Sequence, residues 1–244
     1  MERFFQEEMR ELNNDLLKMA ALVEESIRKS VDALKTMNHA LAEQVISDDA
    51  AIDAMELRIE QKAINLLALH QPMARDLRFI ISTGIKMNSE LERIADMSVN
   101  IAQRVLELGT APLLKPLVDI PRLTELALEM VRKAIDAYVH QDEQKAKEVI
   151  LSDAQVDQLK NAIQDELINE FITKDASTAP RAVPLLLVSR HLERIGDHAT
   201  NIAEDIIYMV KAQVVKHHRE RVIGKDTVPE DDEKSGTGIP DKSV

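Results

Sequence analysis

The same twelve-residue motif occurs twice in this chain of 244 residues. Residues 91–102 read LERIADMSVNIA, residues 192–203 read LERIGDHATNIA, and eight positions are identical. In a helix, the Glu, Asp and Asn of each copy are spaced by four residues, so they lie along one face. Two carboxylates at this spacing repel each other by roughly a few tenths of a kcal/mol. The motif therefore predicts two helices, each with an acidic stripe that helix formation alone does not explain.

The repeat extends over most of the chain. A shift of 104 residues aligns Asp32 with Asp136 and Ile59 with Ile163, and after the second helix of each half the shift falls to 101. We expect the loop around residues 173–180 to absorb this difference and to be three residues shorter than its counterpart. The chain has no Cys or Trp, only six Gly and 2 % aromatic residues, a composition typical of helical bundles. We predict an all-α fold of two tandem three-helix bundles, six helices in total.

Apolar periodicity and prolines divide the chain into segments. Helices are predicted at about residues 3–37, 40–69 and 75–109, and the second half repeats them. The first repeat spans residues 1–109, a proline-rich linker spans 110–120, and the second repeat spans 121–215. Residues 216–244 are charged and poor in apolar side chains, which predicts a disordered tail.

The charge and hydropathy of the chain exclude several classes of protein. A net charge of −12 repels a nucleic-acid backbone, so no nucleic-acid partner is expected. No apolar run approaches the roughly 20 residues that a membrane span requires, and the first residues lack the features of a signal peptide. The absence of cysteine excludes disulfides and thiolate metal sites. We predict a cytoplasmic protein.

The acidic stripes are candidate metal sites. With about 100° per residue, each stripe points away from the leucine and isoleucine face of its helix. The second helix of each half adds an Asp-x-x-x-Asp pair, and consecutive helices joined by a short loop are usually antiparallel neighbours. Such oxygen ligands suit a hard cation such as Mg²⁺, Mn²⁺, Ca²⁺ or oxidised iron, with room for more than one ion. The candidate ligands are Asp49, Asp53, Glu92, Asp96 and Asn100 in the first half, and Asp153, Asp157, Glu193, Asp197 and Asn201 in the second.

Simpler interpretations compete with a metal site. Acidic residues on an outer helix face are ordinary, and Arg93 and Arg194 stand three residues before the motif aspartates, at a spacing that allows ion pairs. His198 follows Asp197, but its counterpart is Met97, so a local surface role is expected for it. An inward-facing di-iron site is excluded, because no His has a Glu three residues before it. No nucleophile motif or phosphate loop is present, so no catalytic residue is assigned and the protein is not expected to be an enzyme.

At these residues the sequence resembles the PhoU family of bacterial phosphate-uptake regulators. The resemblance rests on the two motifs, on the Asp-x-x-x-Asp pairs at 49/53 and 153/157, and on ARDLR at residues 74–78, and it covers about residues 5–215. One feature departs from the family pattern, since four residues separate Asp175 from Pro180 and Arg181. The resemblance implies two bundles related by pseudo-twofold symmetry, a homodimer, and multinuclear clusters of iron, zinc, manganese or magnesium at the acidic motifs.

The resemblance also implies a role in phosphate homeostasis. It implies an adaptor, not an enzyme, that acts between the ATPase subunit of the high-affinity phosphate ABC transporter and the PAS domain of a sensor histidine kinase. The adaptor would restrain phosphate uptake and the phosphate-starvation response, and it would reach the membrane only peripherally, through its partners. Two alternatives stay open: a metal storage or buffering protein, and a non-redox metalloenzyme, which would need an open coordination position beside an acid or base.

Overall fold

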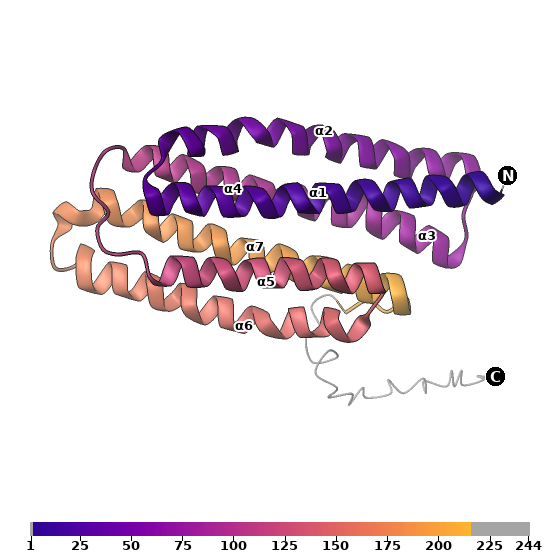
Figure 1. The fold of residues 1–244 in the computed structure, drawn as a ribbon. Helices are drawn as coiled ribbons and strands as arrows, with labels where there is room; N and C mark the ends of the chain where they lie inside the picture. The colour runs from indigo at the N-terminus through magenta and orange to yellow at the C-terminus, as the bar shows by residue number, and fades with distance from the viewer. Residues whose placement is uncertain (1, 216–244) are drawn as a thin grey trace, which may run out of the picture.

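The computed structural model describes residues 2–215 and shows two helical bundles side by side (Figure 1). The first half contains α1 (Glu2–Thr36), α2 (His39–His70), α3 (Ala74–Ile81) and α4 (Asn88–Leu108). A π-helical turn, Ser82–Met87, joins α3 to α4, so the two form one continuous rod. The predicted tail, residues 216–244, lies outside the described residues.

The second half repeats this order. It contains α5 (Asp119–His140), α6 (Glu143–Glu166) with a π-helical continuation at Leu167–Ile172, a 3₁₀ turn at Ala176–Thr178, and α7 (Ala179–Lys211). Between residues 2 and 215 the chain forms six helical rods and no strand, which confirms the predicted fold class.

Equivalent residues begin the second helix of each half. The side chain of Asn38 accepts a hydrogen bond from the backbone of Leu41 at 3.1 Å, and Asp142 accepts bonds from Gln144 and Lys145 at 2.9 and 3.1 Å. These caps satisfy backbone N–H groups that the first turn of a helix leaves without partners. The shift of 104 residues therefore relates the two halves down to their helix caps.

The expectation of a shorter loop in the second half was wrong. Three residues, 71–73, join the second and third helices of the first half, whereas six, 173–178, join them in the second half. The Asp175 side chain accepts from the Ser177 N–H at 3.0 Å and caps a separate 3₁₀ turn. Pro180 in the first turn of α7 suits a helix start, so the sixth helix begins later than its counterpart and the helices are shortened instead.

Packing between the halves follows their symmetry. In each half the first, second and third rods enclose a core of buried aliphatic residues. Across the halves, α4 packs against α7 and α1 packs against α5, an arrangement related by a pseudo-twofold axis. The helices that carry the repeated motif thus form the centre of the molecule, and α2 and α6 lie at its two outer edges (Figure 1).

Candidate metal centres

The first acidic cluster lies between α2 and α4. It consists of Asp49, Asp53 and Glu56 of α2 and Glu92 and Asp96 of α4. Asp53 and Asp96 are exposed, and the other three are partly buried. The stripe therefore lies at the protein surface, facing away from the aliphatic core as expected.

The electrostatics of this cluster show that its carboxylates act on one another across the two helices. Burial, followed by the charges of Asp53 and Asp96, raises the pKa of Asp49 to about 6. Burial and the charges of Asp96, Glu56 and Asp53 likewise raise the pKa of Glu92. Repulsion of this kind is relieved by a proton or by a cation. The Asp pair of α2 and the Glu-Asp pair of α4 have therefore been brought together as predicted.

The second acidic cluster lies between α6 and α7. It consists of Asp153, Asp157, Glu193 and Asp197. Burial, then the charges of Glu193, Asp153 and Asp157, raises the pKa of Asp197 to about 6. Asp153 is only 2 % exposed, which the sequence did not predict. Its position is set by the close packing of α6 against α7, which helical periodicity does not describe.

One position distinguishes the two clusters. A shift of 104 residues places Lys160 where the first half has Glu56. Lys160 Nζ lies 3.2 Å from a carboxylate oxygen of Glu193, and the side chains of both residues are mostly buried. The second cluster therefore contains its own cation, whereas the first contains a fifth carboxylate. Neither residue was predicted from the sequence. Glu56 lies seven residues after Asp49 and three after Asp53, a spacing that places it on the same helix face.

The two motif asparagines have different surroundings. Asn201 Nδ2 donates to a Glu90 oxygen at 3.1 Å, and His198 Nδ1 lies 2.7 Å from the same oxygen. His198 is buried at 8 % exposure between the two halves, so the expected surface role for it was wrong. Glu90, which the sequence did not single out, joins α4 to α7 through these contacts. Asn100 is partly exposed and forms no such link among the described residues.

The donor chemistry of both clusters fits a hard cation. All the charged donors are carboxylates, which magnesium, manganese, calcium and oxidised iron prefer. Within residues 2–215, no three carboxylate or imidazole side chains converge on one point in the arrangement that an ion requires. Ion binding would therefore need the carboxylates to rotate toward a shared point from their present positions.

The arginines suggested as competing partners do not cancel the acidic charge. Arg93 acts on Glu92 and Asp96 in the direction that lowers their pKa, but burial and the neighbouring carboxylates outweigh it. Two arginines of the ARDLR segment, Arg75 and Arg78, connect the halves of the molecule. Arg75 donates to the Gln141 side chain at 2.5 Å, and Arg78 Nε donates to the Met209 carbonyl at 3.3 Å.

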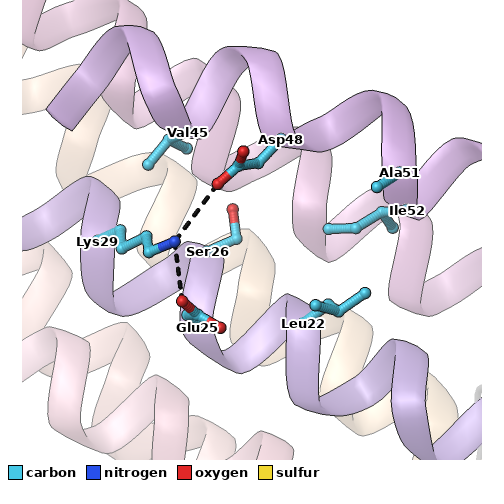
Figure 2. A pocket seen from close by; sticks show the side chains of 8 residues that line it. All are labelled: Leu22, Glu25, Ser26, Lys29, Val45, Asp48, Ala51 and Ile52. Atoms are coloured by element: carbon cyan, nitrogen blue, oxygen red, sulfur yellow. Dashed lines mark hydrogen bonds and ion pairs between the residues drawn. The ribbon is translucent and has the colours of Figure 1, made fainter. Parts of the chain in front are cut away.

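A separate pocket of about 280 Å³ lies between α1 and α2, away from both clusters (Figure 2). Lys29 lies at one end, with its Nζ 2.8 Å from Glu25 and 3.3 Å from Asp48. Leu22 and Ile52 form apolar walls at the other end. None of the candidate metal ligands lines this pocket, so the clusters are not part of this cavity.

Comparison with known proteins matches both halves to one domain. Residues 16–105 and 120–206 each match the PhoU domain. The chain belongs to the PhoU domain family. A relative from Aquifex aeolicus named as a phosphate-specific transport system accessory protein PhoU homolog is 41 % identical, over 86 % of this chain and 94 % of its own length. A Thermotoga maritima relative with the corresponding name is 33 % identical over 91 % of this chain and 94 % of its own length.

Solved PhoU structures share the fold. The regulatory protein PhoU of the phosphate transport system from Streptococcus pneumoniae superposes with a TM-score of 0.80 at 32 % identity, covering 86 % of this chain and 99 % of that one. PhoU from Pseudomonas aeruginosa gives 0.82 at 34 % identity, covering 86 % and 100 %. In the described part of this PhoU-family chain, no helix has the length and apolar character needed to cross a membrane.

Proposed function

We propose that this protein is a cytoplasmic accessory regulator of phosphate transport. The observation that carries the proposal is that relatives named as phosphate transport accessory proteins match this chain over about nine-tenths of its length. In the proposed role, the protein is an adaptor that binds the ATPase subunit of the high-affinity phosphate ABC transporter and the PAS domain of a sensor histidine kinase. It restrains uptake and the phosphate-starvation response when phosphate is plentiful, and it catalyses no reaction itself.

The two acidic clusters supply the physical basis of the adaptor in this proposal. Asp49, Asp53, Glu56, Glu92 and Asp96 would hold a cation in the first half. The second half would use Asp153, Asp157, Glu193 and Asp197, and the asparagine side-chain oxygens are additional candidate ligands in both. A bound cation would offset the burial and the repulsion that together raise the pKa of Asp49, and it would hold α2 against α4. The surface around each cluster would then be less acidic, and a partner protein could dock on it.

The test is binding to the two partners and inhibition of the kinase. Purified protein is mixed with the transporter ATPase subunit and with the kinase PAS domain, and binding and kinase autophosphorylation are measured. The proposal predicts binding to both and lower autophosphorylation. The Asp96→Asn and Asp197→Asn double variant should lose metal and inhibit less. Absence of binding to either partner by metal-loaded protein would reject the adaptor role.

A second candidate function is metal storage or buffering. Its support is the size of the first cluster, in which five carboxylates lie between two helices. A store should take up many ions per chain and release them as the free ion concentration falls, with no dependence on partners. An adaptor should bind few ions and should bind its partners specifically. Metal content after dialysis, compared with partner binding on the same sample, distinguishes the two.

The proposal also includes a homodimer, which the resemblance implies.

Zinc, iron, manganese and magnesium are the ions to test first, since the carboxylate donors accept all of them and favour the harder ones.

A further inference from the structure

The inference concerns α2, which has apolar residues on two opposite faces. Its inner face carries fully or nearly buried residues that pack in the first bundle: Ala42, Val45, Ile52, Ile59, Ala63 and Leu66. A helix at the surface of a protein normally has a single apolar face, which packs on the core, so a second apolar face is unusual. The opposite face of α2 is therefore the one to explain.

The outer face carries a regular row of exposed residues, which we call the outer seam: Ala50, Ala54, Leu57, Gln61, Ile64 and Ala68. Their spacing alternates between four and three residues, as in the seam of a coiled coil. Leu57 is 62 % exposed and Ile64 is 46 % exposed. Single exposed leucines are ordinary, but a row of apolar residues at heptad spacing over about 27 Å of helix is the pattern that a second helix covers.

The fold itself does not require this row. The equivalent residues of α6, reached by the shift of 104, include Gln158, Asn161 and Asp165, and all three are exposed and polar. Leu57 thus corresponds to Asn161, and Gln61 to Asp165. Ala154 and Ile168 are apolar and exposed at both ends of the equivalent row. The two halves therefore differ in the middle of the row, where the first half has Ala54 and Leu57 and the second has polar side chains.

No described element covers the outer seam. The elements that pack against α2 are α1, α4, α3 and the π-helical turn of residues 82–87, and these approach its inner and lateral faces. Figure 1 shows α2 at the outer edge of the molecule, with no ribbon of the described residues beyond it. A partner helix could therefore lie along the seam without displacing any part of the protein.

The flanks of the seam carry opposite charges. Asp53 and Glu60 border it on the side of α4, where the first acidic cluster lies. Arg58 borders it on the side of α1, where Asp15 is 3.3 Å from Arg58 and 2.8 Å from Lys62. A second copy in parallel orientation would place its arginine flank against the acidic flank of the first copy. An antiparallel copy would place acidic flank against acidic flank, which is unfavourable.

Gln61 fits the same arrangement. In a parallel pair, identical positions face each other, so Gln61 would meet Gln61 of the partner subunit. A side-chain amide both donates and accepts hydrogen bonds, and it can therefore pair with its own copy. One polar residue within an apolar seam also favours a single register.

We propose that the outer seam of α2 binds the outer seam of a second copy of this chain, with the two α2 helices parallel about a twofold axis. This inference rests on the homodimer of the proposed function and specifies its interface. Asp53 of each copy would lie opposite Arg58 of the partner subunit, so the acidic cluster borders the interface. A seam of this length gives a small, reversible interface, and dimerisation should depend on protein concentration.

Disulfide cross-linking tests the interface and its orientation, because the natural chain contains no cysteine. The variants Gln61→Cys and Ala68→Cys are each oxidised mildly as the full-length protein, and Asp165→Cys on α6 is the matched control. Both seam variants should form covalent dimers at least about tenfold faster than the control, since identical positions are adjacent in a parallel pair. An antiparallel pair centred on the seam would hold the two copies of residue 68 about 27 Å apart, so Gln61→Cys linking without Ala68→Cys would overturn the parallel arrangement.

Sedimentation velocity over a range of concentrations provides the second measurement. The Leu57→Asp and Ile64→Asp double variant should weaken dimerisation by roughly 100-fold, with an unchanged helical circular dichroism spectrum because both side chains are exposed in the single chain. The Asn161→Asp and Ile168→Asp double variant, on α6 and its π-helical continuation, should dimerise as the natural chain does. A chain that is monomeric at every concentration would overturn the homodimer itself. A dimer that survives the double variant and cross-links equally well at residue 165 would overturn the seam but not the dimer.

Discussion

The two acidic clusters are built on the same plan but differ in charge at one equivalent position. The first has Glu56, which adds a fifth carboxylate, and the second has Lys160, which lies 3.2 Å from Glu193. The substitution of Lys for Glu changes the local charge by two units, so the second cluster contains a cation of its own and the first does not. The two clusters therefore share their arrangement between equivalent helices but not their net charge. We expect the first cluster to bind cations more tightly.

The largest expected effect comes from removing carboxylates from one cluster at a time. Asp53→Asn with Asp96→Asn should lower cation affinity in the first half by roughly 100-fold or more, because two charged oxygen ligands are lost. The matched variant, Asp157→Asn with Asp197→Asn, should remove a weaker site. Equilibrium dialysis with Mn²⁺, followed by metal analysis, measures both. Equal losses of cation affinity in the two variants would contradict the proposal that the first cluster binds cations more tightly.

Exchange of Glu56 and Lys160, the residues that distinguish the two clusters, should change the cation affinity by a smaller factor. Glu56→Lys should weaken cation binding at the first cluster by roughly tenfold, and Lys160→Glu should strengthen it at the second by a similar factor. Isothermal titration with Mn²⁺ gives the two affinities. If Lys160→Glu left the cation affinity of the second site unchanged, the ion pair between Lys160 and Glu193 would not weaken cation binding there.

The pH dependence of stability should show the effect of burial and of the neighbouring carboxylates on Asp49 in the first cluster. The pKa of Asp49 is about 6 in the folded protein, against 3.8 for an isolated Asp, so the folded state binds more protons between these values. Stability from this group is therefore greatest at low pH and falls as the pH rises through about 6. Because Asp49 is only partly buried, we expect the free energy of unfolding to change by about 1 kcal/mol over this pH range. Urea unfolding of chelator-treated protein at pH 5 and pH 7, compared with Asp49→Asn, measures this. The difference in the free energy of unfolding between the two proteins should change with pH. A constant difference would show that the pKa of the Asp49 carboxyl is not raised in the folded protein.

The smallest expected effect separates the two motif asparagines. Asn201→Ala should destabilise the protein by roughly 0.5–1 kcal/mol, because Asn201 donates to Glu90 across the bundles. Asn100→Ala should change stability by less than about 0.5 kcal/mol, as for a substitution away from such a contact. Thermal unfolding of the two variants in the absence of metal provides the comparison. Equal losses of stability in the two variants would mean that the contact of Asn201 with Glu90 contributes nothing to stability beyond what Asn100 contributes.

Most of the fold could be predicted from the sequence because the repeat and the apolar periodicity are strong. The duplicated motif defined two equivalent third helices, and the equivalent caps Asn38 and Asp142 show that the repeat extends to helix ends. The connection at residues 173–178 was predicted wrongly, because an alignment shift shows that residues are missing but not whether a helix or a loop has lost them. Local hydrogen bonding by Asp175 decided the outcome.

The candidate sites were predicted less completely than the fold. The spacing of Asp49, Asp53, Glu92 and Asp96 correctly indicated that two acidic pairs would come together across α2 and α4. The importance of Glu56 was missed because its counterpart is Lys160, and a search for repeated residues does not detect a position where the halves differ. The burial of Asp153 and the contact of His198 with Glu90 depend on the distance between helices, which sequence periodicity does not encode.

The most direct measurement is the affinity of the protein for the transporter ATPase subunit with and without bound cation. Chelator-treated protein and protein loaded with Mn²⁺ are titrated with the subunit, alongside the Asp53→Asn and Asp157→Asn double variant. We predict that the cation strengthens binding by roughly tenfold in the natural protein and has no effect on the variant. The same affinity in all samples would contradict a regulatory role for the acidic clusters.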